Sequence, residues 1–234
     1  MSAIYRREVS AYFHSMVGYV YVAVLLFFSG FYFMVYNLNY GYPSYAYALT
    51  GQVVVLLMAV PVLTMRSMAE DRRSRTDQLL LTSPVTLWGV VWGKYLAMVT
   101  VLAVPTLVSC FCPLIIAMNG SAELMVDYVA ILQLFLLTCL FAAVGLFFSS
   151  LTESQVIAGV TTFAALLILY LWDSIAGFLP GVLGEAASQF SILTPFNDLV
   201  SYRLLHVDGV VLYLSLIGLF LFLTVQTLQK RRWA

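Results

Sequence analysis

The chain has 234 residues, of which 62% are hydrophobic and only 9% are charged, and its formal net charge is zero. Soluble domains are roughly half apolar, so this composition excludes a soluble globular protein and indicates an integral membrane protein. A net charge of zero provides no general attraction to nucleic acid, and we expect no nucleic-acid partner.

Residues 1–16 have the pattern of a helix that lies along a membrane surface. Tyr5, Val9, Tyr12 and Met16 recur at helical spacing, and the charged residues fall elsewhere. An amphipathic helix of this kind lies in the membrane interface with its apolar side toward the lipid. A short flexible segment leading into the first span is the alternative.

Six apolar stretches follow, and each approaches or exceeds the roughly 20 residues that a helix needs to cross a bilayer. Strands of a membrane barrel alternate polar and apolar residues, whereas these stretches are apolar throughout, so we predict an all-α bundle. The predicted spans are Val17–Tyr36, Tyr45–Met65, Val85–Ala117, Tyr128–Ser150, Gln155–Trp172 and Val210–Leu228. Prolines are expected to kink the second and third spans, at Pro61, Pro105 and Pro113.

The basic residues predict the orientation of this bundle. All but one of the eleven lysines and arginines fall on one side of a six-span arrangement, and only Arg203 falls on the other. Cytoplasmic segments of membrane proteins are enriched in Lys and Arg, so both termini are predicted to be cytoplasmic. The ten residues on that side are Arg6, Arg7, Arg66, Arg72, Arg73, Arg75, Lys94, Lys230, Arg231 and Arg232.

The longest segment on the opposite side is 173–208, between the fifth and sixth spans. The run GFLPG at 177–181 ends any helix, Thr194 and Pro195 offer a new helix start, and the residues between remain largely apolar. We predict short re-entrant helices that pack against the bundle, because irregular backbone inside a membrane must be covered by protein.

A dense charged segment, AEDRRSRTDQLLLTSP at 69–84, separates the second and third spans. In a helix, Asp71 would pair with Arg75 and Arg73 with Asp77, because residues four apart are neighbours on a helix surface. Leucines supply an apolar edge to the same helix. Mixed charge beside an apolar edge favours docking to another protein over simple anchoring to lipid.

The stretch MRSMAEDRRSRTDQLLLTSPVTLWGVVWGKYLA at 65–97 resembles the signature region of ABC-transporter type 2 permeases. The C-terminal stretch ILTPFNDLVSYRLLHVDGVVLYLSLIGLFLFLTVQTLQKRRW is similar to the ending of the same group. Within that group the chain looks most like the gliding-motility-associated (GldF-like) permease branch. The resemblance covers essentially the whole chain.

The resemblance implies one transmembrane domain over 1–234, with six spans, an N-terminal elbow helix at 1–16 and re-entrant outer helices at 173–208. It implies a bacterial inner membrane location and pairing with a second permease subunit, identical or related. A dimer of cytoplasmic ABC ATPase subunits would hold the ATP and Mg²⁺, with no cofactor on this chain. Residues 67–83 would be the coupling helix, and the expected ATPase contacts are Glu70, Asp71, Arg72, Arg73, Thr76 and Leu79.

No catalytic motif is present, so we do not expect an enzyme. The run GVVWGK at 89–94 has the wrong spacing for a phosphate-binding loop, and Tyr95 stands where that loop needs Ser or Thr. Gly89 and Gly93 instead fit a helix-contact face of the GxxxG type. The three cysteines lie in apolar runs without partners at metal-ligand spacing, so no metal site is expected.

The function expected is therefore the permease subunit of an ATP-driven exporter. A non-transporting subunit that transmits ATPase motion to periplasmic proteins is the first alternative, because the same coupling helix would serve it. An ion-coupled carrier is the second, but it needs an ionisable group deep in the membrane, and Asp173 near a span end is the only candidate. Spans without charge favour apolar or amphipathic cargo.

Overall fold

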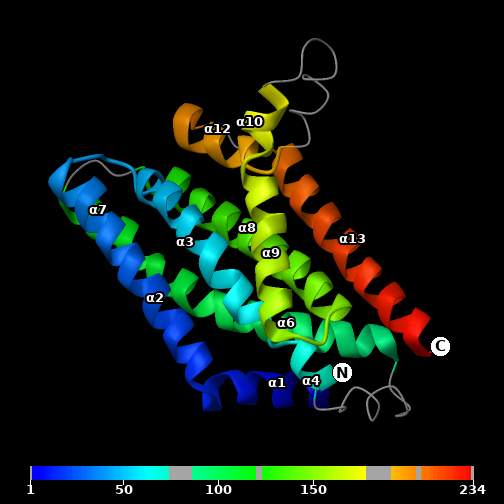
Figure 1. The fold of residues 1–234 in the computed structure, drawn as a ribbon. Helices are drawn as coiled ribbons and strands as arrows, with labels where there is room; N and C mark the ends of the chain where they lie inside the picture. The colour runs from blue at the N-terminus through cyan, green and yellow to red at the C-terminus, as the bar shows by residue number, and fades with distance from the viewer. Residues whose placement is uncertain (1, 74–85, 120–122, 178–190, 204–206, 233–234) are drawn as a thin grey trace.

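The computed structural model describes residues 2–73, 86–119, 123–177, 191–203 and 207–232, and these contain helices and turns but no strand. The helices pack into one bundle (Figure 1). In chain order they are α1 (Ser2–His14), α2 (Met16–Tyr32) continued by the π-helical η1 (Phe33–Asn39), α3 (Ala46–Thr64), α4 (Ala69–Arg73), α6 (Leu87–Ser109), α7 (Phe111–Asn119), α8 (Leu124–Leu151), α9 (Gln155–Tyr170), α10 (Trp172–Gly177), α12 (Thr194–Tyr202) and α13 (Val207–Arg232).

Five helical segments in these ranges are long and apolar enough to cross a membrane, at Met16–Asn39, Ala46–Arg73, Leu87–Met118, Leu124–Leu151 and Val207–Lys230. They coincide with five of the six predicted spans. The remaining predicted span corresponds to α9, an apolar helix of 16 residues. At 1.5 Å per residue α9 is about 24 Å long, shorter than the ~30 Å hydrocarbon core of a bilayer. The fifth predicted span, Gln155–Trp172, therefore stays a prediction.

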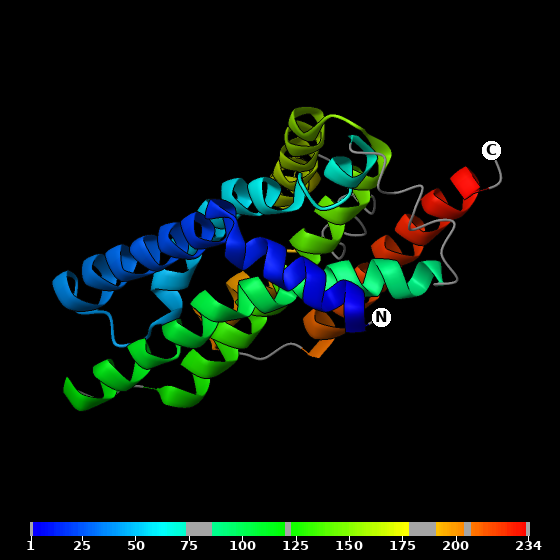
Figure 2. The same ribbon diagram turned by 90° about the horizontal axis from the view of Figure 1, so that it is seen from below.

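Helix α8 forms the centre of the bundle and packs against α3, α6, α9 and α13. Its contact with α3 is very close at Gly145, where an added Cβ would lie 2.3 Å from Thr64 Oγ1. A residue without a side chain is therefore needed at this point for the two helices to pack. The ribbon seen from below shows α1 running across α6 (Figure 2), and these two helices are in contact.

The predicted N-terminal helix is present as α1, and it meets α2 at a sharp corner. Ser15 has extended backbone angles (φ −94°, ψ 151°) and separates the two helices. α1 crosses the lower end of the bundle in Figure 1, where α4 and the C-terminal end of α13 also lie. Its buried residues are Ile4, Glu8 and Tyr12, which recur at helical spacing. Whether α1 lies in a membrane interface stays a prediction.

The predicted kink at Pro113 is confirmed as a break between α6 and α7 around Cys110. Proline has no N–H, so Pro113 cannot donate to the carbonyl of Ser109, four residues earlier. Pro61 and Pro105 lie inside α3 and α6, which continue past them.

The two short helices α10 and α12 lie at the end of the bundle opposite α1 (Figure 1). α12 begins at Thr194 with Pro195 in its first turn, as predicted. Residues 178–190 and 204–206 lie outside the described ranges, so the re-entrant arrangement of 173–208 stays a prediction.

Asp127, in the first turn of α8, caps the N-terminus of α3 at the end of the bundle opposite α1. Its fully buried carboxylate accepts a hydrogen bond from Ser44 Oγ at 2.7 Å and one from the Tyr45 backbone N–H at 2.8 Å. A carboxylate at a helix N-terminus satisfies N–H groups that have no partner within the helix and faces the positive end of the helix dipole. The predicted fourth span begins at Tyr128, whereas α8 begins at Leu124 and therefore includes Asp127.

Replacing Asp127 with alanine should lower the free energy of unfolding by about 1–3 kcal/mol, because two buried donors lose their acceptor. Thermal unfolding in mild detergent measures the effect. Glu123→Ala is the matched control at the same end, since it removes only the half-exposed ion pair with Arg203 and should cost at most about 1 kcal/mol. Equal losses in the two variants would contradict the capping role.

Candidate functional site

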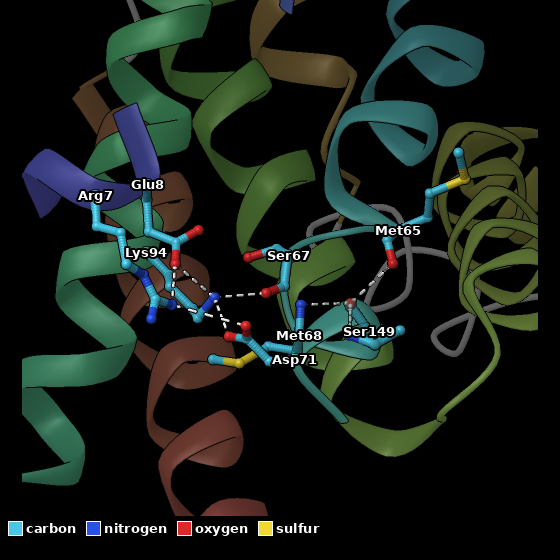
Figure 3. Close-up of polar contacts among 9 residues, drawn as sticks. Arg7, Glu8, Met65, Ser67, Met68, Asp71, Lys94 and Ser149 are labelled. Atoms are coloured by element: carbon cyan, nitrogen blue, oxygen red, sulfur yellow. Dashed lines mark hydrogen bonds and ion pairs between the residues drawn. The ribbon is translucent and has the colours of Figure 1, made fainter. Parts of the chain in front are cut away.

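Lys94 on α6 is the centre of a buried polar cluster at the α1 end of the bundle (Figure 3). Its side chain is only 1% exposed. The ammonium group lies 3.0 Å from Glu8 Oε1 and 2.6 Å from Asp71 Oδ2, and it donates a 2.6 Å hydrogen bond to the Ser67 carbonyl oxygen. Lys94 therefore joins α6 to α1, to α4 and to the turn that connects α3 with α4.

Arg7 completes the charge balance of this cluster from its exposed side. Its guanidinium lies 2.8 Å from Glu8 Oε1 and 3.7 Å from Asp71 Oδ1. The hydrogen bond with Glu8 raises the pKa of Arg7 above its usual value, so the cation persists. Two cations thus face two carboxylates. Charges removed from water must be paired in this way, because an unpaired buried ion is very costly.

The turn between α3 and α4 is held from its other side by Ser149 of α8 (Figure 3). Ser149 Oγ accepts hydrogen bonds from the backbone N–H groups of Met68 at 3.1 Å and Ala69 at 3.2 Å, and it donates to the Met65 carbonyl oxygen at 3.3 Å. N–H groups at the start of a helix lack partners within the helix, and the Ser149 hydroxyl supplies one for α4. The turn is therefore attached to both α6 and α8.

Helix α4 has a third attachment through Arg72. Its guanidinium donates to Glu153 Oε1 at 2.9 Å, which joins α4 to the link between α8 and α9. The Arg72 side chain is 17% exposed and Glu153 is 72% exposed, so this pair is more open to solvent than the Lys94 cluster. Screening by water makes it the weaker of the two connections.

The residues that were expected to contact an ATPase fall into three groups: those bound within the chain, those exposed on α4 and those outside the described residues. Asp71 and Arg72 are bound within the chain, to Lys94 and Glu153 respectively, whereas Glu70 and Arg73 are exposed on α4. Thr76 and Leu79 lie outside the described residues, as do Arg75 and Asp77, the predicted helical partners of Asp71 and Arg73.

Sequence reasoning used Lys94 only as an orientation signal and missed its role in the cluster. The available signal was a single lysine inside an otherwise apolar span, because such a residue is rarely buried unless it is paired. Gly89 and Gly93, one helical turn apart on the same helix, are both buried. Their role as a helix-contact face stays a prediction.

Two hollows adjoin the cluster. A polar pocket of about 420 Å³ lies between α1 and the α3–α4 turn. An apolar groove of about 600 Å³ runs between α2 and α3, with residues from Met16 to Tyr32 on one side and from Val54 to Val62 on the other. Across the described part of the chain, no group of three or more His, Cys, Asp or Glu residues is placed to hold a metal ion.

The charged groups of this cluster bind one another and, with Ser149, form a joint that connects the α3–α4 turn and α4 to α1, α6 and α8. None of the curated proteins with which the chain was compared matches it. Residues 43–215, about three quarters of the chain, match the family described as ABC-2 family transporter protein. That region includes the α3–α4 turn, Lys94 and Ser149, and the chain therefore belongs to the ABC-2 transporter family as a multi-pass membrane permease.

Proposed function

We propose that this permease couples a separate cytoplasmic ABC ATPase to substrate export, with α4 and the residues up to 83 as its coupling element. The observation that carries the proposal is the attachment of the α3–α4 turn on two sides, through Lys94 to α6 and α1 and through Ser149 to α8. Membership of the family supports an ABC ATPase as the partner.

The joint would transmit movement in a defined way. A partner that displaced α4 would pull on α6 through the Asp71–Lys94 pair and on α8 through Ser149. Because close-packed interiors transmit strain, helices held on both sides would shift together rather than let the turn bend. The apolar groove between α2 and α3 gives this motion a route for apolar or amphipathic cargo.

The remaining parts of the proposal concern assembly. The ATPase would hold ATP and Mg²⁺ as a dimer, and two permease subunits, identical or related, would form the transmembrane part. The end that carries α1, α4 and the end of α13 would face the cytoplasm across a bacterial inner membrane, as the basic residues favour. Six spans, an elbow helix and re-entrant outer helices belong to this proposal, as does placement in the GldF-like branch.

A charge reversal on the exposed face of α4 tests the coupling proposal. The full chain, affinity-tagged in its native host, is purified from membranes and the captured material is assayed for ATP hydrolysis. Wild type should retain an ATPase, whereas the double variant Glu70→Lys/Arg73→Glu should lose it tenfold or more, because several interface charges then repel. Lys230→Glu, an exposed reversal at the same end on α13, is the matched control and should retain it.

Undiminished ATPase capture by the double variant would show that α4 does not contact the partner. Loss of capture in Lys230→Glu as well would show a general charge effect at this end rather than a socket at α4. Either result would overturn the coupling role, while leaving membership of the family unaffected.

A further inference from the structure

Arg66, in the turn after α3, is one of the cations at this end that lie outside the buried cluster. Its Nε atom is buried and has no hydrogen-bond partner, and its guanidinium forms no ion pair with any residue that the structure describes. The nearby carboxylates of Glu8 and Asp71 are held by Lys94 and Arg7. Arg66 is partly exposed, so its guanidinium, which forms no ion pair with the described residues, favours an anionic ligand that supplies acceptor oxygens.

Arg66 lines the polar pocket of about 420 Å³. The pocket is built from α1 and the start of α2 on one side and from the α3–α4 turn on the other. Arg7 lies at its exposed side, and the hydroxyl-bearing residues Tyr12 and Ser67 also line it. Lys94 and the carboxylates of Glu8, Glu70 and Asp71 complete the lining. Its dimensions and its donors fit a phosphate group better than a bare inorganic cation, which would meet the unpaired guanidinium.

The polar pocket and the apolar groove are neighbours at the start of α2, where Val17 lines both. The groove follows α2 from Met16 to Tyr32, about 24 Å at 1.5 Å per residue. One leaflet of a bilayer has about 15 Å of hydrocarbon, half of the ~30 Å core. The groove is therefore long enough for a complete acyl chain, and the pocket that Arg66 lines adjoins it at Val17.

We propose that the polar pocket and the adjoining groove together bind one glycerophospholipid, with the phosphodiester at Arg66 and one acyl chain along the groove between α2 and α3. A second copy of the chain pressed against the groove would cover its apolar side chains but would leave the Arg66 guanidinium without an anion. A phospholipid satisfies both parts at once. The proposal rests on α2 and α3 lying in a membrane and does not depend on an ATPase partner.

The bound lipid would contact both α1 and the α3–α4 turn. Its phosphate would lie beside Arg7 and Tyr12 of α1 and beside Ser67, whose carbonyl oxygen Lys94 holds. The site therefore places a membrane component in contact with α1 and with the α3–α4 turn simultaneously.

Native mass spectrometry of the full chain in mild detergent, titrated with palmitoyl-oleoyl-phosphatidylglycerol, tests the site. Wild type should retain one lipid per chain at the lowest concentrations. Arg66→Gln should weaken this binding tenfold or more, because a hydrogen bond to a charged group is lost. Ala59→Trp, which fills the groove from α3, should weaken it to a similar extent.

Two matched controls separate the site from general effects. Arg73→Gln removes an exposed charge at the same end but outside the pocket, and Leu214→Trp adds a bulky ring on the exposed face of α13. Both should bind the lipid as wild type does. Thermal unfolding with and without lipid is measured on every variant, and Ala59→Trp gives an independent reading if Arg66→Gln does not fold.

Three results would overturn the proposal. Inorganic phosphate that competes fully, with binding unaffected by Ala59→Trp, would reveal an anion site without a lipid chain. A wild-type dimer that retains no lipid and is broken by Ala59→Trp would assign the groove to a second copy. Equal lipid retention in wild type and Arg66→Gln would show ordinary annular lipid. No ATPase is present in this assay, so its failure is independent of the coupling proposal.

Discussion

Replacing Lys94 with methionine is expected to lower the free energy of unfolding by about 3–5 kcal/mol, the usual loss when one partner of a buried ion pair is removed. The side chains of Glu8 and Asp71 are 11% and 18% exposed, and among the described residues the cation that these carboxylates would still contact is the partly exposed Arg7. The Ser67 carbonyl oxygen would lose its donor as well. Thermal or denaturant unfolding in mild detergent measures this loss.

Two further variants identify its cause. Lys94→Arg keeps the charge and should lose less than Lys94→Met. The triple variant Glu8→Gln/Asp71→Asn/Lys94→Met removes all three ions and should recover much of the stability, because no charge is then left buried without its partner. A single Lys94→Met variant as stable as wild type would show that Lys94 does not hold the two carboxylates of the cluster.

Gly18→Ala is expected to lower the free energy of unfolding by about 1–3 kcal/mol, as overpacking in a tight contact does. A Cβ at this position would lie 2.4 Å from the backbone oxygen of Tyr12, so the corner between α1 and α2 would have to open. Backbone, unlike a flexible side chain, cannot turn away. Thermal unfolding measures the loss, and a spin-label distance between α1 and α3 measures the displacement of α1.

Gly30→Ala on the same helix is the matched control. A Cβ there would meet nothing within 4 Å. Because alanine is favoured over glycine in helices by about 1 kcal/mol, this variant should be as stable as wild type or slightly more so. If the two alanine variants unfolded at the same temperature, the close contact at Gly18 would not hold the corner.

The helical spans follow from the sequence because length and apolar content are local properties of the chain. Five predicted spans match the long helices, and Pro113 marks the break after α6 through its missing N–H group. The end of α9 is different. Residues up to Trp172 are apolar, but the helix ends at Tyr170, and apolar content alone does not mark that end.

The buried face of α1 shows what local periodicity missed. The apolar residues Tyr5, Val9 and Tyr12 predict a helix correctly, yet the buried face consists of Ile4, Glu8 and Tyr12. An acid takes a buried position because Lys94, 86 residues further along, supplies its counter-charge. Hydrophobic patterning assigns charges to the surface, so it cannot identify a buried pair whose partner lies on another helix.

The sequence by itself therefore determined that this protein is a helical membrane permease and that a charged segment interrupts its spans. It also determined that nearly all basic residues lie on one side of those spans. Only the tertiary structure decided what that segment does within the chain. Asp71 turns to Lys94, Arg72 reaches Glu153, and Ser149 holds the start of α4 from a position 81 residues away from Met68. Such partners are set by how helices distant in sequence pack together, and no spacing within one segment encodes them.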